Sequence, residues 1–166
     1  MPDPNRDAKS QAKDLWKTGD HLESGRVLFE NLPKDEQVTW AVAILDFTTE
    51  WLDVWMCGIW ELKRVARKRR RWRAAHQAFT KIRGTTLRLE RRKTLTPVQE
   101  RMLCQCFVAE NVAKVIYNAT DPIDPFDEDS GWWIVPCLKS CIDCLAMPEF
   151  DEAVTSMLFG VETRPV

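Results

Sequence analysis

Apolar side chains recur at intervals of three, four or seven residues from about residue 35 to about residue 83, with no proline in that range. This spacing is typical of one face of an α-helix. The positions that carry the pattern are Trp40, Ile44, Phe47, Trp51, Val54, Gly58, Leu62, Val65, Trp72 and Phe79. A single helix of about 49 residues would be about 73 Å long, longer than a compact domain of this size. We therefore predict a long central element with a break or kink between Thr48 and Gly58.

Punctuating residues mark the ends of further helices. Near the start of the chain, Gly19 interrupts the helical pattern and Asp20 follows as a helix N-cap. Pro33 lies near the first turn of the central element. Toward the end of the chain, two short helices are expected, the second beginning near Pro148 and ending near Gly160.

A second long helix is predicted over residues 97–118. A polar connector over 83–95 precedes it, and Thr96 and Gln99 have the spacing of a capping box. This helix is expected to lie antiparallel to the basic part of the central element. The stretch 120–131 is rich in proline and acidic residues, which indicates a loop.

These elements predict an all-α fold. With 166 residues, 45% of them hydrophobic, the chain can bury one core, and few alternating patterns are present to build a sheet. We predict a single-domain antiparallel bundle of about five helices with one long or kinked central helix. Residues 1–12 are expected to form a flexible N-terminal tail, 13–160 the helical domain and 161–166 a C-terminal tail.

The apolar stretch before Lys63 resembles a membrane span followed by cations. Asp46, Glu50 and Asp53 lie within it, and a carboxylate in the middle of a bilayer costs about 2.5–3.5 kcal/mol. We therefore expect a water-exposed acidic face on this helix, with Glu61 roughly in line, and no membrane span. The polar opening of the chain lacks the apolar core of a signal peptide, which favours a cytoplasmic protein.

The net charge of −1 hides a strong asymmetry along the chain. Residues 63–93 hold 14 Lys and Arg against the single Glu90, a local charge of +13, and the other 135 residues hold 10 basic and 24 acidic groups, a charge of −14. On a helical wheel, the cations from Lys63 to Arg73 point in nearly every direction. A helix that is polar all round projects into solvent, pairs with many acids or binds an anionic partner.

We interpret residues 63–93 as the basic helix-loop segment of a non-catalytic binding or regulatory module. Its partner would be an acidic protein surface, on another protein or on a second copy of the chain. The alternative is an RNA- or DNA-binding protein, because arginine binds phosphates in bidentate fashion and Trp72 and Phe79 can stack on bases. The candidate partner-binding cations are Lys63, Arg64, Arg67, Lys68, Arg70, Arg71, Arg73, Lys81, Arg83, Arg88, Arg91, Arg92 and Lys93.

The cysteines are expected to be thiols in a chain without secretory features. Cys137, Cys141 and Cys144 have the C-x3-C-x2-C spacing of the iron–sulfur site in radical S-adenosylmethionine enzymes, but the same spacing also defines one face of a helix. We interpret them as small hydrophobic side chains in the core. Cys104 and Cys106 would point to different faces of their helix, and paired zinc-binding knuckles are missing. No metal or cofactor is expected, and a cysteine-ligated metal protein is kept only as a third, weaker alternative.

No nucleophile motif is present in the sequence, so we expect no enzymatic activity. The two histidines are interpreted structurally. His21 follows the N-cap Asp20 and belongs to a helix start. His76 lies on the apolar stripe and is expected to be a partly buried packing residue.

Overall fold

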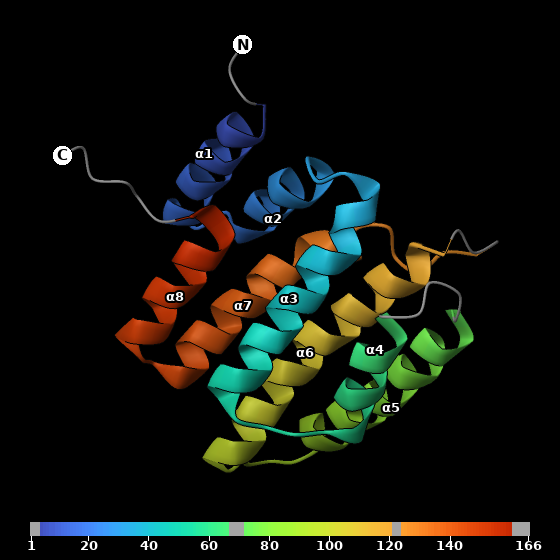
Figure 1. Cartoon of the computed structure of the whole chain (residues 1–166). Helices are drawn as coiled ribbons and strands as arrows, with labels where there is room; N and C mark the ends of the chain where they lie inside the picture. The colour runs from blue at the N-terminus through green and yellow to red at the C-terminus, as the bar shows by residue number, and fades with distance from the viewer. Residues whose placement is uncertain (1–3, 67–71, 121–123, 161–166) are drawn as a thin grey trace.

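The computed structural model describes residues 4–66, 72–120 and 124–160 (Figure 1). Every regular element in these ranges is an α-helix, which confirms the predicted all-α class. The described ranges contain eight helices, where the sequence indicated about five. They are α1 (Pro4–Lys17), α2 (His21–Glu30), α3 (Lys34–Leu52), α4 (Cys57–Ala66), α5 (Trp72–Glu90), α6 (Pro97–Asn118), α7 (Ser130–Leu145) and α8 (Pro148–Phe159).

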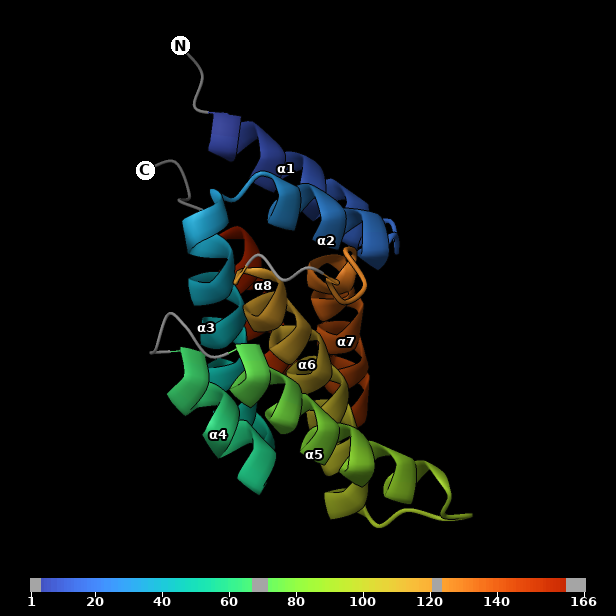
Figure 2. The same cartoon turned by 90° about the vertical axis from the view of Figure 1, so that its right-hand side faces the viewer.

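Helix α6 lies at the centre of the bundle, and α3, α5 and α7 pack around it (Figures 1 and 2). Helix α4 packs mainly against α5, and α8 contacts both α1 and α7. The α1–α2 pair lies across one end of the other helices, where α2 contacts α7. The central place of α6 explains its fully buried side chains, which are Gln105, Cys106, Val108, Ala109 and Val112.

The predicted long central element is divided into three helices. Helix α3 ends at Leu52 and α4 begins at Cys57, which confirms a break between Thr48 and Gly58. Asp53 follows α3 in the left-handed conformation, with φ of 52°. Aspartate is one of the few residues besides glycine that adopt this conformation readily, so the chain leaves the helix direction here.

The polar connector predicted over 83–95 is corrected, because α5 continues to Glu90. Ile82, Thr86 and Leu89 are buried along one side of this part of α5. They lie at helical spacing, so the inward face of the helix extends well past the point where the composition becomes polar.

Helices α5 and α6 are antiparallel, as predicted. Thr86 of α5 donates a hydrogen bond to Glu110 of α6 at 2.5 Å. Ten positions earlier on α5, His76 lies near Tyr117, with 6.3 Å between the ring centres. Residue numbers therefore fall along α6 as they rise along α5.

The predicted helix caps are present. Thr96 Oγ1 accepts the Gln99 N–H at 3.3 Å, and Gln99 Oε1 accepts the Thr96 N–H at 3.0 Å, which completes the capping box of α6. Asp20 caps α2 by accepting the N–H of its third residue at 3.2 Å. Helix α8 begins at Pro148 and is followed by Gly160, also as predicted.

The start of the chain differs from the predicted tail over residues 1–12, because α1 is helical from Pro4 onward. Ala8 and Ala12 face α2 and are buried, and the Ser24 hydroxyl donates to the Ala12 carbonyl at 2.7 Å. These small side chains allow α1 and α2 to approach closely, but they contribute little to an apolar pattern. The predicted C-terminal tail, 161–166, lies outside the described residues.

The acidic face of α3 is exposed to solvent. Asp46, Glu50 and the following Asp53 are all exposed, which confirms the interpretation of these carboxylates as a solvated face. Among the described helices, none combines the length and the apolar composition needed to cross a bilayer.

Candidate interaction surface

Two tryptophans are largely exposed on α4 and the turn before it. Trp55 is 72% exposed and Trp60 is 68% exposed, the highest fractions among the large hydrophobic side chains that the structure describes. Ile59 and Leu62 form the buried side of α4, and Trp60 lies off that side. Exposed aromatic residues close together in the chain are typical of a protein-binding surface.

Two of the predicted cations lie on the same helix as Trp60. The Lys63 ammonium is 5.8 Å from the centre of the Trp55 ring and 2.6 Å from a carboxylate oxygen of Asp46 on α3. The first distance is within the range of a cation–π interaction. Arg64 is exposed one helical turn after Trp60, on the same face. We refer to Trp55, Trp60, Lys63 and Arg64 as the α4 surface.

Several other predicted cations contact groups within the chain. Lys81 forms an ion pair with Glu61, and Arg83 lies 3.4 Å from the Glu110 carboxylate, which is only 7% exposed. Arg88 donates a hydrogen bond to the Thr85 hydroxyl at 3.1 Å. Part of the positive charge of α5 is therefore directed at the protein's own acidic groups.

The described cations of the predicted basic segment are spread over α4, the whole length of α5 and the residues just after it. Arg73 is exposed near the start of α5, whereas Arg91, Arg92 and Lys93 are exposed just after its end. These two groups are separated by about 27 Å of helix. The remaining candidates lie outside the described residues or have side chains that do: Arg67, Lys68, Arg70, Arg71 and Trp72.

Phe79, a predicted stacking residue, is half-buried between α5 and the loop before α7. The ring centre of Phe79 is 5.2 Å from that of Phe126. The Lys114 ammonium lies 5.6 Å from the same Phe79 ring centre. Lys114 also pairs with Asp127 at 2.8 Å, which holds the loop against α6. Phe79 therefore contributes to an intramolecular aromatic cluster, and its role in binding a partner stays a prediction.

Both histidines pack against aromatic rings. His21 begins α2 and stacks on Trp16, with ring centres 4.6 Å apart, and burial is the main cause that lowers its pKa. His76 stacks on Phe126 at 5.5 Å. The predicted partly buried position of His76 is corrected, because its side chain is exposed apart from the stacked ring face. The helix start predicted for His21 is confirmed.

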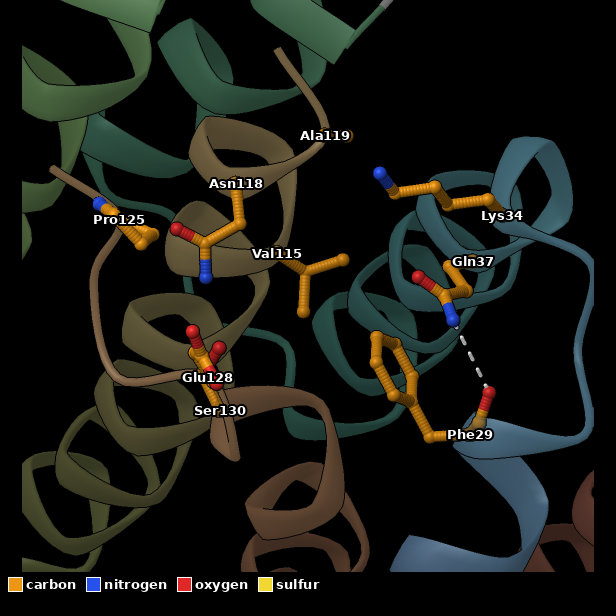
Figure 3. A pocket seen from close by; sticks show the side chains of 9 residues that line it. All are labelled: Phe29, Lys34, Gln37, Val115, Asn118, Ala119, Pro125, Glu128 and Ser130. Atoms are coloured by element: carbon orange, nitrogen blue, oxygen red, sulfur yellow. Dashed lines mark hydrogen bonds between the residues drawn. The ribbon is translucent and has the colours of Figure 1, made fainter. Parts of the chain in front are cut away.

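A pocket of about 320 Å³ opens beside the start of α3 and the loop before α7 (Figure 3). Two of the amide side chains that line it hydrogen-bond to the backbone. Gln37 donates to the Phe29 carbonyl at 3.4 Å. Asn118 donates to the Phe126 carbonyl at 2.7 Å and accepts its N–H at 2.9 Å. These bonds indicate that the amides hold the loop and the end of α2 in place.

The core position predicted for the three cysteines of α7 is confirmed for Cys141 and in part for Cys137, whereas Cys144 is half-buried outside the core. Cys141 is fully buried and Cys137 packs against the core, where burial raises its pKa to about 12. Cys104 and Cys106 face different neighbours, because Cys104 contacts α7 and Cys106 Sγ lies 3.6 Å from Met56 Sδ. Within the ranges described, no three His, Cys, Asp or Glu side chains are placed to hold a metal ion.

Trp55 and Trp60 are absent from the sequence-based candidates. Trp60 lies between the stripe positions Gly58 and Leu62, and Trp55 directly follows the stripe position Val54. Their place off the apolar stripe is the signal that indicates exposure. The local excess of arginine and lysine drew attention to Trp72 and Phe79 instead.

Comparison of the chain with protein-family models, curated proteins and solved structures finds no match in any of the three.

Proposed function

We propose that the protein is a non-catalytic intracellular binding module whose α4 surface engages an acidic surface of another protein. The observation that carries this proposal is the high exposure of Trp55 and Trp60, at 72% and 68%, beside the exposed Arg64. In contrast, Trp16, Trp40 and Trp51 pack against the hydrophobic core. The α4 surface is thus a place where aromatic side chains remain available to a partner.

Aromatic anchors supply the apolar part of such binding. A tryptophan that becomes buried removes about 150–250 Å² from water, and each Å² of apolar surface contributes about 25 cal/mol. Two anchors close together in the chain therefore provide a favourable term large enough to offset part of the cost of association.

Charge supplies orientation and the preference for an acidic partner. Arg64 lies one turn from Trp60, so a carboxylate on the partner can meet the guanidinium while an apolar group covers the indole. Lys63 lies between Trp55 and Asp46, and because it pairs with Asp46 it offers less charge to a partner than Arg64 does. The further cations over 67–73 follow directly in the chain.

Nucleic-acid binding is the second candidate function. Arg91, Arg92 and Lys93 are exposed together, and exposed cations of this kind neutralise phosphates. The pairing of Lys81 and Arg83 with acids of the same chain, and the packing of Phe79, reduce what α5 offers to a phosphate backbone. These contacts favour the protein partner.

A displayed random-peptide library tests the proposal. The library is selected against the full chain, and the enriched peptides are then measured against the double variant Trp55→Ser/Trp60→Ser and the charge variant Arg64→Glu. We expect enriched peptides that combine Asp or Glu with apolar residues, and an affinity loss of about 30-fold or more in the double variant, as for interface hot spots.

Trp133→Ser is the matched control, because Trp133 is 44% exposed but lies on α7. It should retain the affinity of the wild-type chain. Peptides without acidic residues, or peptides that bind the double variant equally well, would contradict the proposal. Labelled single-stranded RNA and duplex DNA are titrated in parallel at several salt concentrations. Tight, steeply salt-dependent binding of either would favour the second candidate function, and sedimentation of the chain alone shows whether a second copy is the partner.

A further inference from the structure

Three thiols meet where α6 packs against α7. Cys104 of α6 has its sulfur 3.8 Å from the Ser140 carbonyl of α7. Ser140 directly precedes Cys141 and lies one helical turn before Cys144, so α7 places both thiols beside the Cys104 sulfur, and both lower its pKa. Two neighbouring turns of α7 therefore present sulfur atoms to the same residue of α6.

The three cysteines differ in access to solvent. Cys141 is fully buried, whereas Cys104 and Cys144 are half-buried. Cys144 lies in the last turn of α7, which ends at Leu145. The end of a helix yields more easily than its middle, so Cys144 has more freedom than Cys141 to move toward Cys104.

The pKa values of these thiols differ, because their surroundings differ. Hydrogen bonds from Cys141 and then Cys144 lower the pKa of Cys104 to about 7, against burial and the nearby Glu100. Burial, followed by the charge of Cys104, raises the pKa of Cys144 to about 12. Near neutral pH, Cys104 thus exists partly as a thiolate beside neutral thiols, and the thiolate is the nucleophilic form.

The same arrangement does not suit a metal ion. The described side chains include no group of three potential ligands placed to hold one. The Cys104 sulfur lies beside the turn of α7 that leads from Cys141 to Cys144, and a disulfide needs only two thiols.

We propose that Cys104 is a peroxide-reactive thiol and that Cys144 resolves its oxidised form into a disulfide between α6 and α7. The Cys104 thiolate attacks a hydroperoxide, the O–O bond breaks, and the sulfur becomes a sulfenic acid while the peroxide is reduced to water or an alcohol. The Cys144 sulfur then attacks that sulfur while its proton passes to the departing hydroxyl group, so the S–O bond breaks and water leaves. Two electrons pass from the two thiols to one peroxide, and Cys141 acts as the hydrogen-bond donor that stabilises the Cys104 thiolate.

Hydrogen peroxide, added to the purified, reduced chain, provides the test. Peptide mapping without reductant should show a Cys104–Cys144 cross-link that disappears after reduction. In Cys144→Ser, the sulfenic acid of Cys104 should persist and react with dimedone, and Cys104→Ser should form neither product. Cys106→Ser is the matched control, because Cys106 is buried and its sulfur contacts Met56 instead of α7. It should form the same cross-link as the wild-type chain.

Three results would overturn the proposal. The first is wild-type chain that forms no Cys104–Cys144 cross-link, and the second is a cross-link that joins Cys104 to Cys141 instead. The third is dimedone labelling of wild-type or Cys144→Ser chain at a cysteine other than Cys104. Mapping the wild-type chain needs no substitution, so a variant that folds poorly leaves the test intact.

Discussion

Gly25 stands where the backbone of α2 packs tightly against α7. A Cβ added at this position would lie 2.1 Å from the Trp132 carbonyl oxygen. Backbone cannot move aside as a flexible side chain does, so Gly25→Ala should force α2 away from α7. We expect a loss of about 1–3 kcal/mol in the free energy of unfolding, measured by urea denaturation.

The matched substitution Gly84→Ala should act in the opposite direction. Gly84 lies in the interior of α5, and a Cβ there would meet no atom within 4 Å. Alanine loses less conformational entropy than glycine in a helix, so we expect a gain of about 0.5–1 kcal/mol. Equal effects of the two substitutions would show that helix propensity, and not contact with α7, determines the role of Gly25.

The ionisation of Cys104 gives a pH-dependent reactivity. Its pKa is lowered to about 7 by the Cys141 and Cys144 thiols, while Glu100 opposes this shift. Because the thiolate fraction rises with pH, the rate of alkylation by iodoacetamide at Cys104 should reach half its maximum near pH 7. Cys106, whose pKa burial raises to about 11, should react only at much higher pH. The rates are measured by mass spectrometry of quenched samples, and a half-maximum of Cys104 near pH 9 would contradict the lowered pKa.

At the level of single residues, the sequence predicts local chemistry better than it predicts contacts. Asp20 and Thr96 cap helices as expected, because a cap depends only on residues a few positions away. Ala8 and Ala12 were assigned to a tail, because their burial depends on the neighbouring helix and not on their own hydrophobicity. Trp60 differs from these alanines, because its place off the apolar stripe of the sequence already indicates its exposure.

Among the helices, α6 has the most complete cap, and its removal should be measurable. Thr96→Ala removes the hydroxyl that accepts the Gln99 N–H and leaves one N–H of the first turn without its side-chain partner. We expect a loss of about 1 kcal/mol in the free energy of unfolding. Thr94→Ala is the control, because Thr94 is exposed two positions earlier and outside the cap. Equal losses in both variants, measured by urea denaturation, would contradict the role of the cap.

The boundaries of helices were predictable where a strong local signal coincides with the packing. The limits of α6 and α8 follow from capping residues and proline, and the break after α3 was expected from the length that one continuous helix would have. The end of α5 was placed too early, because the inward residues Thr86 and Leu89 are embedded in a polar stretch. In such a helix the exposed polar residues outnumber the buried ones, so the amino-acid composition of the segment resembles that of a loop.

Across the whole molecule, the charge asymmetry of the sequence is partly compensated by folding. Lys63 reaches back to Asp46 and Lys81 to Glu61, so acids and bases that are distant in the chain come together. Charge counting along the sequence identified the basic segment but could not show these pairs. The candidate surface therefore lies at the tryptophans of α4, which no count of charges would indicate.

The contact of α2 with α7 affects how the protein folds during its synthesis on the ribosome. The chain is made from its N-terminus, so α2 emerges long before α7, with α3, α4, α5 and α6 in between. Until α7 has been synthesised, the side of α2 that carries Gly25 lacks the helix against which it packs. Nascent chains that stall before α7 would expose this side to chaperones and to one another, so the bundle can close only late in translation.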